Sequence, residues 1–307
     1  MQGKDSKERD CLSFEGFCAC VRIDISHRLK GAEVAVQEVI KNNGIRLHGL
    51  VIREHGSSLS PTIYLEQFYR QYQDGMEIGR IENIILDIYR RDKPPVCFDE
   101  GSFLDWNQSK KRVVFRLVNR EMNMDLLGLV PHVPYLDLDV IFVYRLEGMA
   151  DGSAGITIYN SHLDMWGVTV EDLYDVAKRN TSRLLAPVIQ SMDDVLKGMC
   201  EGEEDAFDGM LAGIPPMYVL TNRYKYNGAV GMLYKEVLGG LADSIGCGLY
   251  ILPSSIHELI LVPMVDGGDE EELNEMVRSV NAQEVAPDEV LSDHVYRYIR
   301  ETGEITM

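Results

Sequence analysis

Long apolar runs are missing from this sequence of 307 residues. A helix that crosses a bilayer needs about 20 consecutive apolar residues, and no segment approaches that length. Residues 1–10 are polar and charged, so they lack the apolar stretch of a secretory signal peptide. These absences predict a cytoplasmic protein with no membrane partner, and residues 1–10 are expected to form a disordered leader.

Cysteines are few and scattered. Cytoplasmic thiols stay reduced, so no disulfide framework is expected. Cys18 and Cys20 are two residues apart on a predicted helix, where their side chains point away from each other and cannot chelate one ion. Buried thiols are therefore predicted for Cys11, Cys18 and Cys20, and no metal or other cofactor is expected. The other cysteines are Cys97, Cys200 and Cys247, and most of the six lie in apolar contexts.

Basic residues are also scarce. The chain has 30 Lys and Arg against 49 Asp and Glu, a net charge of −19. Such a surface repels phosphate backbones and anionic membranes, so direct nucleic-acid binding is not expected. Solubility alone accounts for this charge; the alternatives are a basic protein partner and a carboxylate mimic of nucleic acid.

Familiar catalytic motifs are absent as well. The sequence has no Gly-x-Gly-x-x-Gly after a predicted strand, no Walker loop, no His-Glu-x-x-His and no Gly-x-Ser-x-Gly. The common nucleotide-binding, zinc-protease and α/β-hydrolase classes are thereby removed, whereas an enzyme with an unfamiliar site is not.

What is present predicts an α+β protein whose N-terminal part, residues 11–108, is rich in helix. Ser13 is the expected N-cap of an amphipathic helix over residues 14–29. The turn at residues 42–44, Asn-Asn-Gly, lies between two apolar runs and predicts a hairpin, with continued helix as the alternative for its first arm.

Two further helices are predicted in the same part. Ser60-Pro61 is a typical helix start, Asp74-Gly75 a stop, and residues 78–88 form the next apolar face before Pro94-Pro95, so the pair should pack as a helical hairpin. The first helix has an aromatic face that predicts core packing or, alternatively, a groove for a partner helix, formed by Tyr64, Phe68, Tyr69 and Tyr72.

Two antiparallel-sheet lobes are predicted to follow, over residues 109–200 and 209–307. An acidic stretch at residues 201–205 is the expected linker. The order over residues 215–300 is β-α-β-β-α-β, the split βαβ order that usually places two helices on one face of a sheet. Residues 111–185 have nearly the same order, and residues 115–120 echo residues 218–223, so an internal duplication is a hypothesis.

Local motifs place several of these elements. Thr169-x-x-Asp172 is a capping box that opens a helix reaching about residue 185. In the second lobe, Gly246 is expected to close one helix and Asp269 to cap the next. Apolar runs predict the strands at residues 113–118, 138–146, 156–159, 218–220, 249–252, 259–262 and 295–299.

Two histidine segments are candidate sites. His162-x-Asp164, followed by Trp166, resembles a metal-ligand pair in a loop before a helix N-terminus, where anions also bind. The alternative is a structural loop. His257 and Glu258 follow two serines, Ser254 and Ser255, which more readily satisfy the turn backbone than complete a catalytic triad. Partner recognition is the remaining function for that loop.

Two asparagine–arginine pairs end predicted strands. They are Asn119-Arg120 and Asn222-Arg223. An arginine beside an amide is suited to bind a carboxylate or phosphate. The simpler alternative is strand termination with an arginine on the surface.

Several phrases together resemble a known family. They include residues 60–65 (Ser-Pro-Thr-Ile-Tyr-Leu), Tyr69-x-x-Tyr72-x-x-Gly75, Asn160 with Trp166-Gly167-Val168, Ala177-x-x-Asn180-Thr181, residues 251–258 and residues 291–296. The set resembles an uncharacterised domain-of-unknown-function family of gut-dwelling Gram-positive anaerobes and is more distantly similar to the YtpQ-like proteins. The resemblance implies one intact bacterial protein and no particular activity.

The leading hypothesis is a cytoplasmic, non-catalytic binding or regulatory protein, because no catalytic constellation accompanies the acidic composition. The second is a hydrolase with an unfamiliar site between the lobes, which requires several of the polar candidates to converge. The third is an acidic mimic of nucleic acid.

Overall fold

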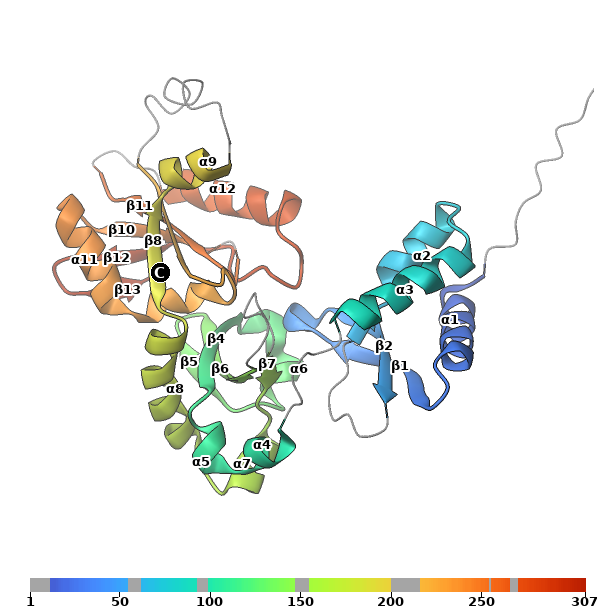
Figure 1. Cartoon of the computed structure of the whole chain (residues 1–307). Coiled ribbons are helices and arrows are strands. Elements are labelled where there is room, and N and C mark those ends of the chain that lie inside the picture. Colours follow the sequence, from blue (N-terminus) through green and yellow to red (C-terminus); the bar gives the residue numbers. More distant parts are fainter. Residues whose placement is uncertain are drawn as a thin grey trace, which may run out of the picture. The chain divides into compact units, whose positions relative to one another are not determined.

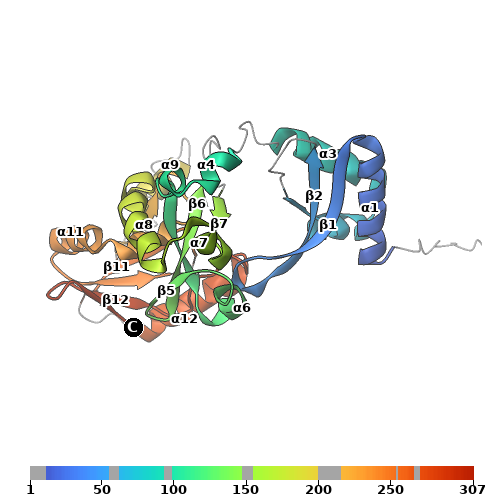
Figure 2. The same cartoon turned by 90° about the horizontal axis from the view of Figure 1, so that it is seen from below.

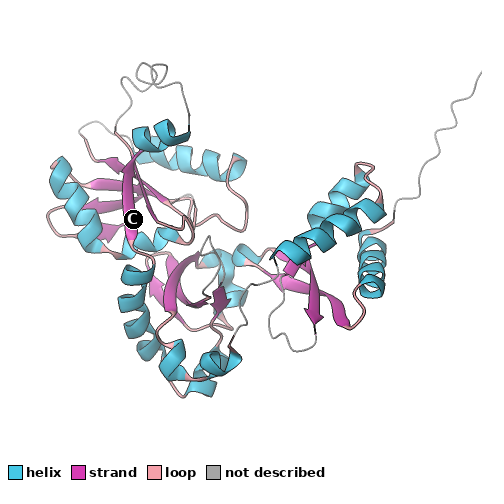
Figure 3. Ribbon diagram, in the orientation of Figure 1, coloured by secondary structure: helices cyan, strands magenta, loops and turns pink. Residues whose placement is uncertain are grey.

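The protein is described here from a computed structural model that covers residues 12–54, 62–92, 99–146, 155–199, 216–253, 255–265 and 270–307. The chain divides into two compact units (Figures 1 and 3): unit 1 comprises residues 1–41 and 46–100, and unit 2 comprises residues 42–45 and 101–307. Helices accompany three antiparallel sheets, which confirms the α+β class.

Unit 1 is a three-stranded sheet flanked by helices (Figure 2). Ser13 caps the first helix by accepting a hydrogen bond from the amide of Gly16, as predicted, and the hairpin is also confirmed. Apolar residues from the helices and strands form one core. The elements are α1 (Phe14–Arg28), β1 (Ala32–Ile40), β2 (Arg46–Glu54), β3 (Thr62–Tyr64), α2 (Glu66–Gln73) and α3 (Ile78–Asp92).

The start of the second helix differs from the prediction. Ser60 and Pro61 lie outside the described residues, residues 62–64 form β3, and α2 begins only at Glu66. Ile63 lies opposite Leu50 of β2, and both side chains are buried, so strand pairing outweighs the local helix signal. Tyr64 is consequently on a strand, whereas the other three aromatic residues of the predicted face lie on α2 and pack in or against the core.

The first sheet of unit 2 has the order β4-β6-β5, with β7 also paired to β6. Phe115 of β4 contacts the ring of Tyr174 on α8, while Val118 on the opposite face packs with Leu127 of α6. The elements are α4 (Glu100–Leu104), α5 (Trp106–Ser109), β4 (Val113–Asn119), η2 (Glu121–Asn123), α6 (Met124–Leu127), β5 (His132–Tyr135), β6 (Leu138–Arg145), β7 (Gly155–Thr157), α7 (Asn160–Trp166) and α8 (Val170–Leu184).

The second sheet of unit 2 has the order β13-β12-β10-β11-β9-β8. It contains the predicted β-α-β-β-α-β series, extended by a strand at each edge. The elements are β8 (Pro187–Ser191), α9 (Met192–Met199), β9 (Tyr218–Asn222), η3 (Gly228–Leu233), α11 (Lys235–Ile245), β10 (Leu249–Leu252), β11 (Leu259–Pro263), α12 (Glu270–Gln283), β12 (Tyr296–Ile299) and β13 (Glu304–Thr306).

The two long helices of this sheet lie on opposite faces, whereas the element order predicted one face. Val277 of α12 packs with Tyr250 of β10. Gly239 of α11 instead lies against Tyr298, which is paired with Leu249 and therefore points to the other side of the sheet. Each face of the second sheet is thus covered by its own helix.

The strand orders bear on the predicted duplication. The strands predicted for the first series are β4, β6 and β7, and the structure adds β5, which was not predicted from the sequence. With β5 included and the strands taken in chain order, β4, β5 and β6 and then β9, β10 and β11 are arranged 1-3-2 with antiparallel neighbours. The fourth strands differ, because β7 pairs with β6 whereas β12 pairs with β10. Three shared strands support the duplication, which stays a hypothesis.

Some predictions lie outside the described residues: the leader at residues 1–10, the linker at residues 201–205, Asp269, Ser254, and three of the cysteines. Of the thiols within the described ranges, Cys18 is buried, and burial raises its pKa to about 11. Cys20 is exposed and Cys247 is half-buried, so the prediction of buried thiols is wrong for Cys20, which lies on the solvent side of α1. In the same ranges, no helix has the length and apolarity required to cross a bilayer.

Candidate functional site

A pocket of about 430 Å³ opens at one end of the first sheet of unit 2. Four of its lining side chains are basic, and no carboxylate is among the described residues that line it. The full lining is Ser102, Gln108, Lys111, Arg112, Tyr144, Arg145, Arg183 and Leu184. In a chain with a net charge of −19, this local excess of positive charge distinguishes the pocket from the bulk composition.

Three segments bring the basic side chains together. Arg112 directly precedes β4 and Arg145 ends β6, and the amide of Arg145 donates a hydrogen bond to the carbonyl of Arg112 at 3.0 Å. Asn180 of α8 donates to the carbonyl of Lys110 at 2.8 Å, which holds this helix against the start of β4. Arg183 follows Asn180 by about one helical turn and so reaches the same end of the sheet.

Three of the basic groups, those of Lys111, Arg145 and Arg183, are incompletely satisfied by the protein. Lys111 donates to the side-chain oxygen of Gln108 at 2.9 Å, and the buried Nε of Arg145 has no hydrogen-bond partner. Over the described part of the chain, neither Lys111, Arg145 nor Arg183 forms an ion pair with a carboxylate. Arg120 and Arg300 of the same unit do have such partners. Unpaired, clustered cations favour the binding of an anion.

Tyr224 connects this pocket with the loop after β9. The guanidinium groups of Arg145 and Arg223 lie 4.3 and 4.5 Å from the centre of its ring, and Arg223 also donates a hydrogen bond to its hydroxyl. Burial raises the pKa of the Tyr224 phenol, but hydrogen bonds and charges from the two arginines outweigh that effect, so the pKa lies below its usual value. The candidate Arg223 is therefore linked to the pocket through Tyr224.

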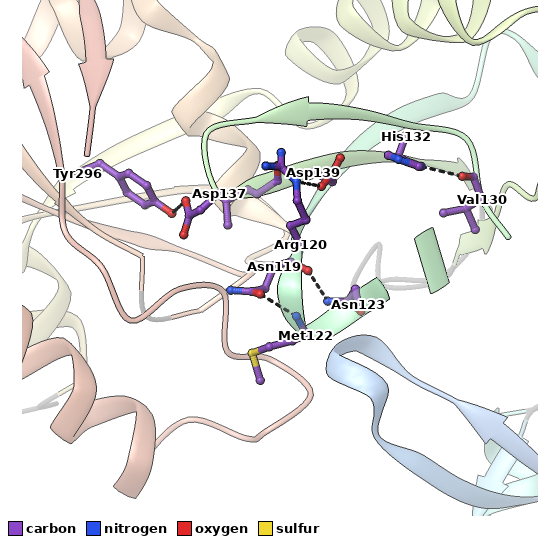
Figure 4. Close-up of polar contacts among 10 residues, drawn as sticks. Asn119, Arg120, Met122, Asn123, Val130, His132, Asp137, Asp139 and Tyr296 are labelled. Atoms are coloured by element: carbon purple, nitrogen blue, oxygen red, sulfur yellow. Dashed lines mark hydrogen bonds and ion pairs between the residues drawn. The ribbon is translucent and has the colours of Figure 1, made fainter. Parts of the chain in front are cut away.

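Asn119 and Arg120, the first predicted pair, have their own protein partners (Figure 4). Asn119 accepts from the amide of Met122 at 2.9 Å. It also donates to the carbonyl of Leu291, which Figure 4 does not label, at 3.0 Å. Arg120 donates from Nε to the buried carboxylate of Asp139 at 2.6 Å. These contacts favour the role of strand termination over ligand binding.

Asn222 acts in the same way at the end of β9. Its side chain accepts from the amide of Tyr224 at 2.9 Å and donates to the carbonyl of Tyr226 at 2.8 Å. Because Asn222 is buried, it shapes the loop that carries Arg223 rather than meeting solvent.

The His162 segment is helical rather than a loop, since residues 160–166 form α7. The Nδ1 of His162 accepts from the amide of Tyr159 at 3.1 Å, and burial lowers the pKa of His162. Trp166 is buried and donates to the carbonyl of Phe103 at 2.9 Å, whereas Asp164 is exposed. Across the described residues, no group of three metal-ligating side chains is present.

His257 lies between β10 and β11. Its Nδ1 accepts from the amide of Asn227 at 3.2 Å, and its Nε2 is 3.4 Å from a carboxylate oxygen of Glu289. Burial is the largest effect on the pKa of His257 and lowers it; the charge of Arg116 acts in the same direction, and Glu289 and Glu258 oppose it. Glu258 affects the pKa of His257 only through its charge. The two candidate histidines thus lie on different elements, each within its own set of contacts.

The pocket itself was missed by motif reasoning. One signal was available in the run at residues 110–112, Lys-Lys-Arg, which directly precedes a predicted strand. Arg145 and Arg183 carry no comparable signal, because a basic residue at the end of a strand or in the last turn of a helix is ordinary.

The fold and the pocket define an α+β protein with an unassigned basic site. A family model described as a family of unknown function, DUF5688, matches residues 14–300. The chain belongs to this family, because the match covers nearly its whole length. No curated protein matches the chain, and no solved structure matches it.

Proposed function

We propose that this chain is a non-catalytic binding protein that holds a small anionic ligand in the basic pocket of unit 2. The observation that carries the proposal is the convergence of Lys111, Arg112, Arg145 and Arg183 on one pocket of about 430 Å³. This volume is within the range of about 300–1,000 Å³ that small-molecule sites occupy. Each charge-assisted hydrogen bond from such groups contributes roughly twice a neutral one.

The non-catalytic character rests on the surroundings of the candidate acid–base groups. The Nδ1 of His162 accepts from a backbone amide, and His257 lies between an amide and Glu289. A hydrolase would need a nucleophile and a base within hydrogen-bond reach of each other in one pocket. Neither histidine lines the basic pocket, so binding is favoured over the hydrolase alternative.

We also propose that the protein is cytoplasmic and that it has a basic protein partner. The net charge of −19 supports an interaction with a positively charged surface, and it opposes direct contact with nucleic acid. The nucleic-acid mimic is the third candidate, and it has no support beyond the same excess of carboxylates.

The anion site is tested by thermal unfolding and calorimetry with phosphate, sulfate and citrate at constant ionic strength. A ligand that binds only the folded state raises the Tm with its concentration. We expect this rise in the wild type and its loss in Lys111→Gln and Arg183→Gln, both of which alter exposed side chains.

The matched control is Arg179→Gln, which removes the same charge from an exposed position one turn earlier on α8 and outside the pocket. It should respond to anions as the wild type does. An equal rise in Tm in all three variants would mean that the anions act by general screening of charge and not through the pocket. No rise in the wild type would refute the anion site.

A further inference from the structure

The cations of the basic pocket come from three segments of the chain rather than from one element. Lys111 and Arg112 precede β4, Arg145 ends β6, and Arg183 is in the last turn of α8. A ligand with a single anionic group can meet only part of such a set. A ligand with several anionic groups in a row can meet members from each segment at once.

Mutual repulsion among these cations favours the same kind of ligand. Like charges that share a partly enclosed site raise each other's electrostatic energy. The buried Nε of Arg145 has no hydrogen-bond partner, and within the described residues no carboxylate forms an ion pair with Lys111 or Arg183. Each added negative charge on one ligand therefore removes a further part of the repulsion.

The lining offers little to an aromatic ligand. Tyr144 is 2% exposed and so cannot present its ring face for stacking. The neighbouring ring of Tyr224 is already in contact with the guanidinium groups of Arg145 and Arg223. The remaining lining is largely polar, and Gln108 and Ser102 are neutral hydrogen-bonding groups. Recognition of a nucleobase is thus not favoured.

We propose that the ligand is a short polyphosphate group, either a free inorganic chain or the phosphate tail of a larger molecule, and that the pocket selects it by the number of phosphates. This inference rests on the proposed anion-binding function and specifies its ligand. Arg145 at the end of β6 and Arg183 in the last turn of α8 supply guanidinium groups, while Lys111 supplies a point charge from a third segment.

Isothermal titration calorimetry at constant ionic strength tests it, with orthophosphate, pyrophosphate, tripolyphosphate, ATP and citrate as probes. Because each further charge-assisted contact is worth about tenfold in affinity, we expect about a tenfold gain at each step from orthophosphate to tripolyphosphate. ATP should bind no more tightly than tripolyphosphate. Arg183→Gln should weaken the binding of every anion, and the loss should be about tenfold larger for tripolyphosphate than for orthophosphate. Arg179→Gln should match the wild type.

The outcomes separate this inference from the proposed function. Equal affinity for orthophosphate and tripolyphosphate, or binding of citrate without tripolyphosphate, overturns the polyphosphate ligand and leaves anion binding intact. ATP binding far more tightly than tripolyphosphate also overturns it, because the base would then be recognised. Absence of binding by every probe overturns both.

Discussion

Tyr296 of β12 donates a hydrogen bond to Oδ1 of Asp137 at 2.5 Å (Figure 4). Asp137 lies in the turn between β5 and β6, so this contact joins the second sheet of unit 2 to the first. Ser292 donates to the other oxygen of the same carboxylate at 3.2 Å. Burial and the hydrogen bond to Asp137 raise the pKa of Tyr296, which is fully buried.

Tyr296→Phe removes this hydrogen bond while keeping the ring. Because it leaves a carboxylate oxygen without its donor, we expect a loss of about 1–3 kcal/mol in the free energy of unfolding. Urea denaturation monitored by circular dichroism measures the change. Tyr298→Phe is the control on the same strand, since among the described residues nothing accepts a hydrogen bond from that hydroxyl. Equal losses in both variants would contradict the assigned role.

Gly228→Ala tests the packing of η3. A Cβ at this position would lie 2.3 Å from both the carbonyl oxygen of His257 and Oγ1 of Thr221. Since backbone is one of the clashing groups, we expect destabilisation by about 2–3 kcal/mol. Gly240→Ala on α11 is the control, because its Cβ would meet no atom within 4 Å, and it should gain up to about 1 kcal/mol. The Tm of each variant is compared with that of the wild type. A Tm for Gly228→Ala as high as that for Gly240→Ala would contradict the close packing of η3.

Glu82 of unit 1 is expected to make stability fall with rising pH. Burial, followed by the hydrogen bond and charge of Asp24, raises the pKa of Glu82 to about 7, although Arg28 at 3.1 Å opposes the shift. The ordinary value is 4.5, so the folded state holds a proton that the unfolded state releases between pH 4.5 and 7. The stabilisation is full below this window and is lost as pH rises through it.

Glu82→Gln should remove that dependence. The difference in the free energy of unfolding between the variant and the wild type should shift in favour of the variant by at least about 1 kcal/mol from pH 4 to pH 8. At pH 4 the wild-type carboxyl is protonated in both the folded and the unfolded state. Denaturant unfolding at both pH values measures the two differences. A difference that is the same at pH 4 and pH 8 would refute the raised pKa.

His257 is expected to act in the opposite direction. Its pKa is lowered in the folded protein, mainly by burial, so the unfolded state binds more protons once the pH falls below the ordinary value of 6.5. Stability is therefore full above pH 6.5 and decreases as the pH falls below that value. Burial lowers the pKa of His162 as well, which adds a loss of the same sign.

His257→Asn should reduce this acid sensitivity, because the asparagine oxygen can still accept from the amide of Asn227 but does not titrate. Between pH 6.5 and 5, we expect the variant to lose about 1 kcal/mol less than the wild type. Unfolding at pH 8, where both histidines are neutral, gives the pH-independent effect of the substitution. Parallel curves for the two proteins would show that His257 does not contribute.

Local signals determined several elements of this fold. Ser13 caps α1, the capping box of Thr169 and Asp172 opens α8, and Gly246 ends α11 in a left-handed conformation. Each of these signals involves residues close together in the sequence, so local interactions are sufficient to fix the helix ends. The overall α+β class followed from the same signals.

Tertiary contacts decided what those signals left open. Ile63 entered a strand because β2 was available to pair with it, and residues 160–166 formed a helix packed on Phe103 rather than the predicted loop. The asparagines of the two predicted pairs were used to terminate strands. Backbone N–H and C=O groups at a strand end lack a partner in the sheet, and the side-chain amides of these asparagines form hydrogen bonds with such groups. The amides are therefore not free to bind a ligand.

The sequence by itself determined the acidic charge, the helix caps and the secondary-structure class. Only the tertiary structure decided that Lys111, Arg145 and Arg183, which are far apart in the chain, line one pocket. The physical reason is the sequence separation of the interacting groups. A helix cap involves residues within one turn of each other, whereas this pocket forms only after β4 has paired with β6 and α8 has packed against the start of β4 through Asn180.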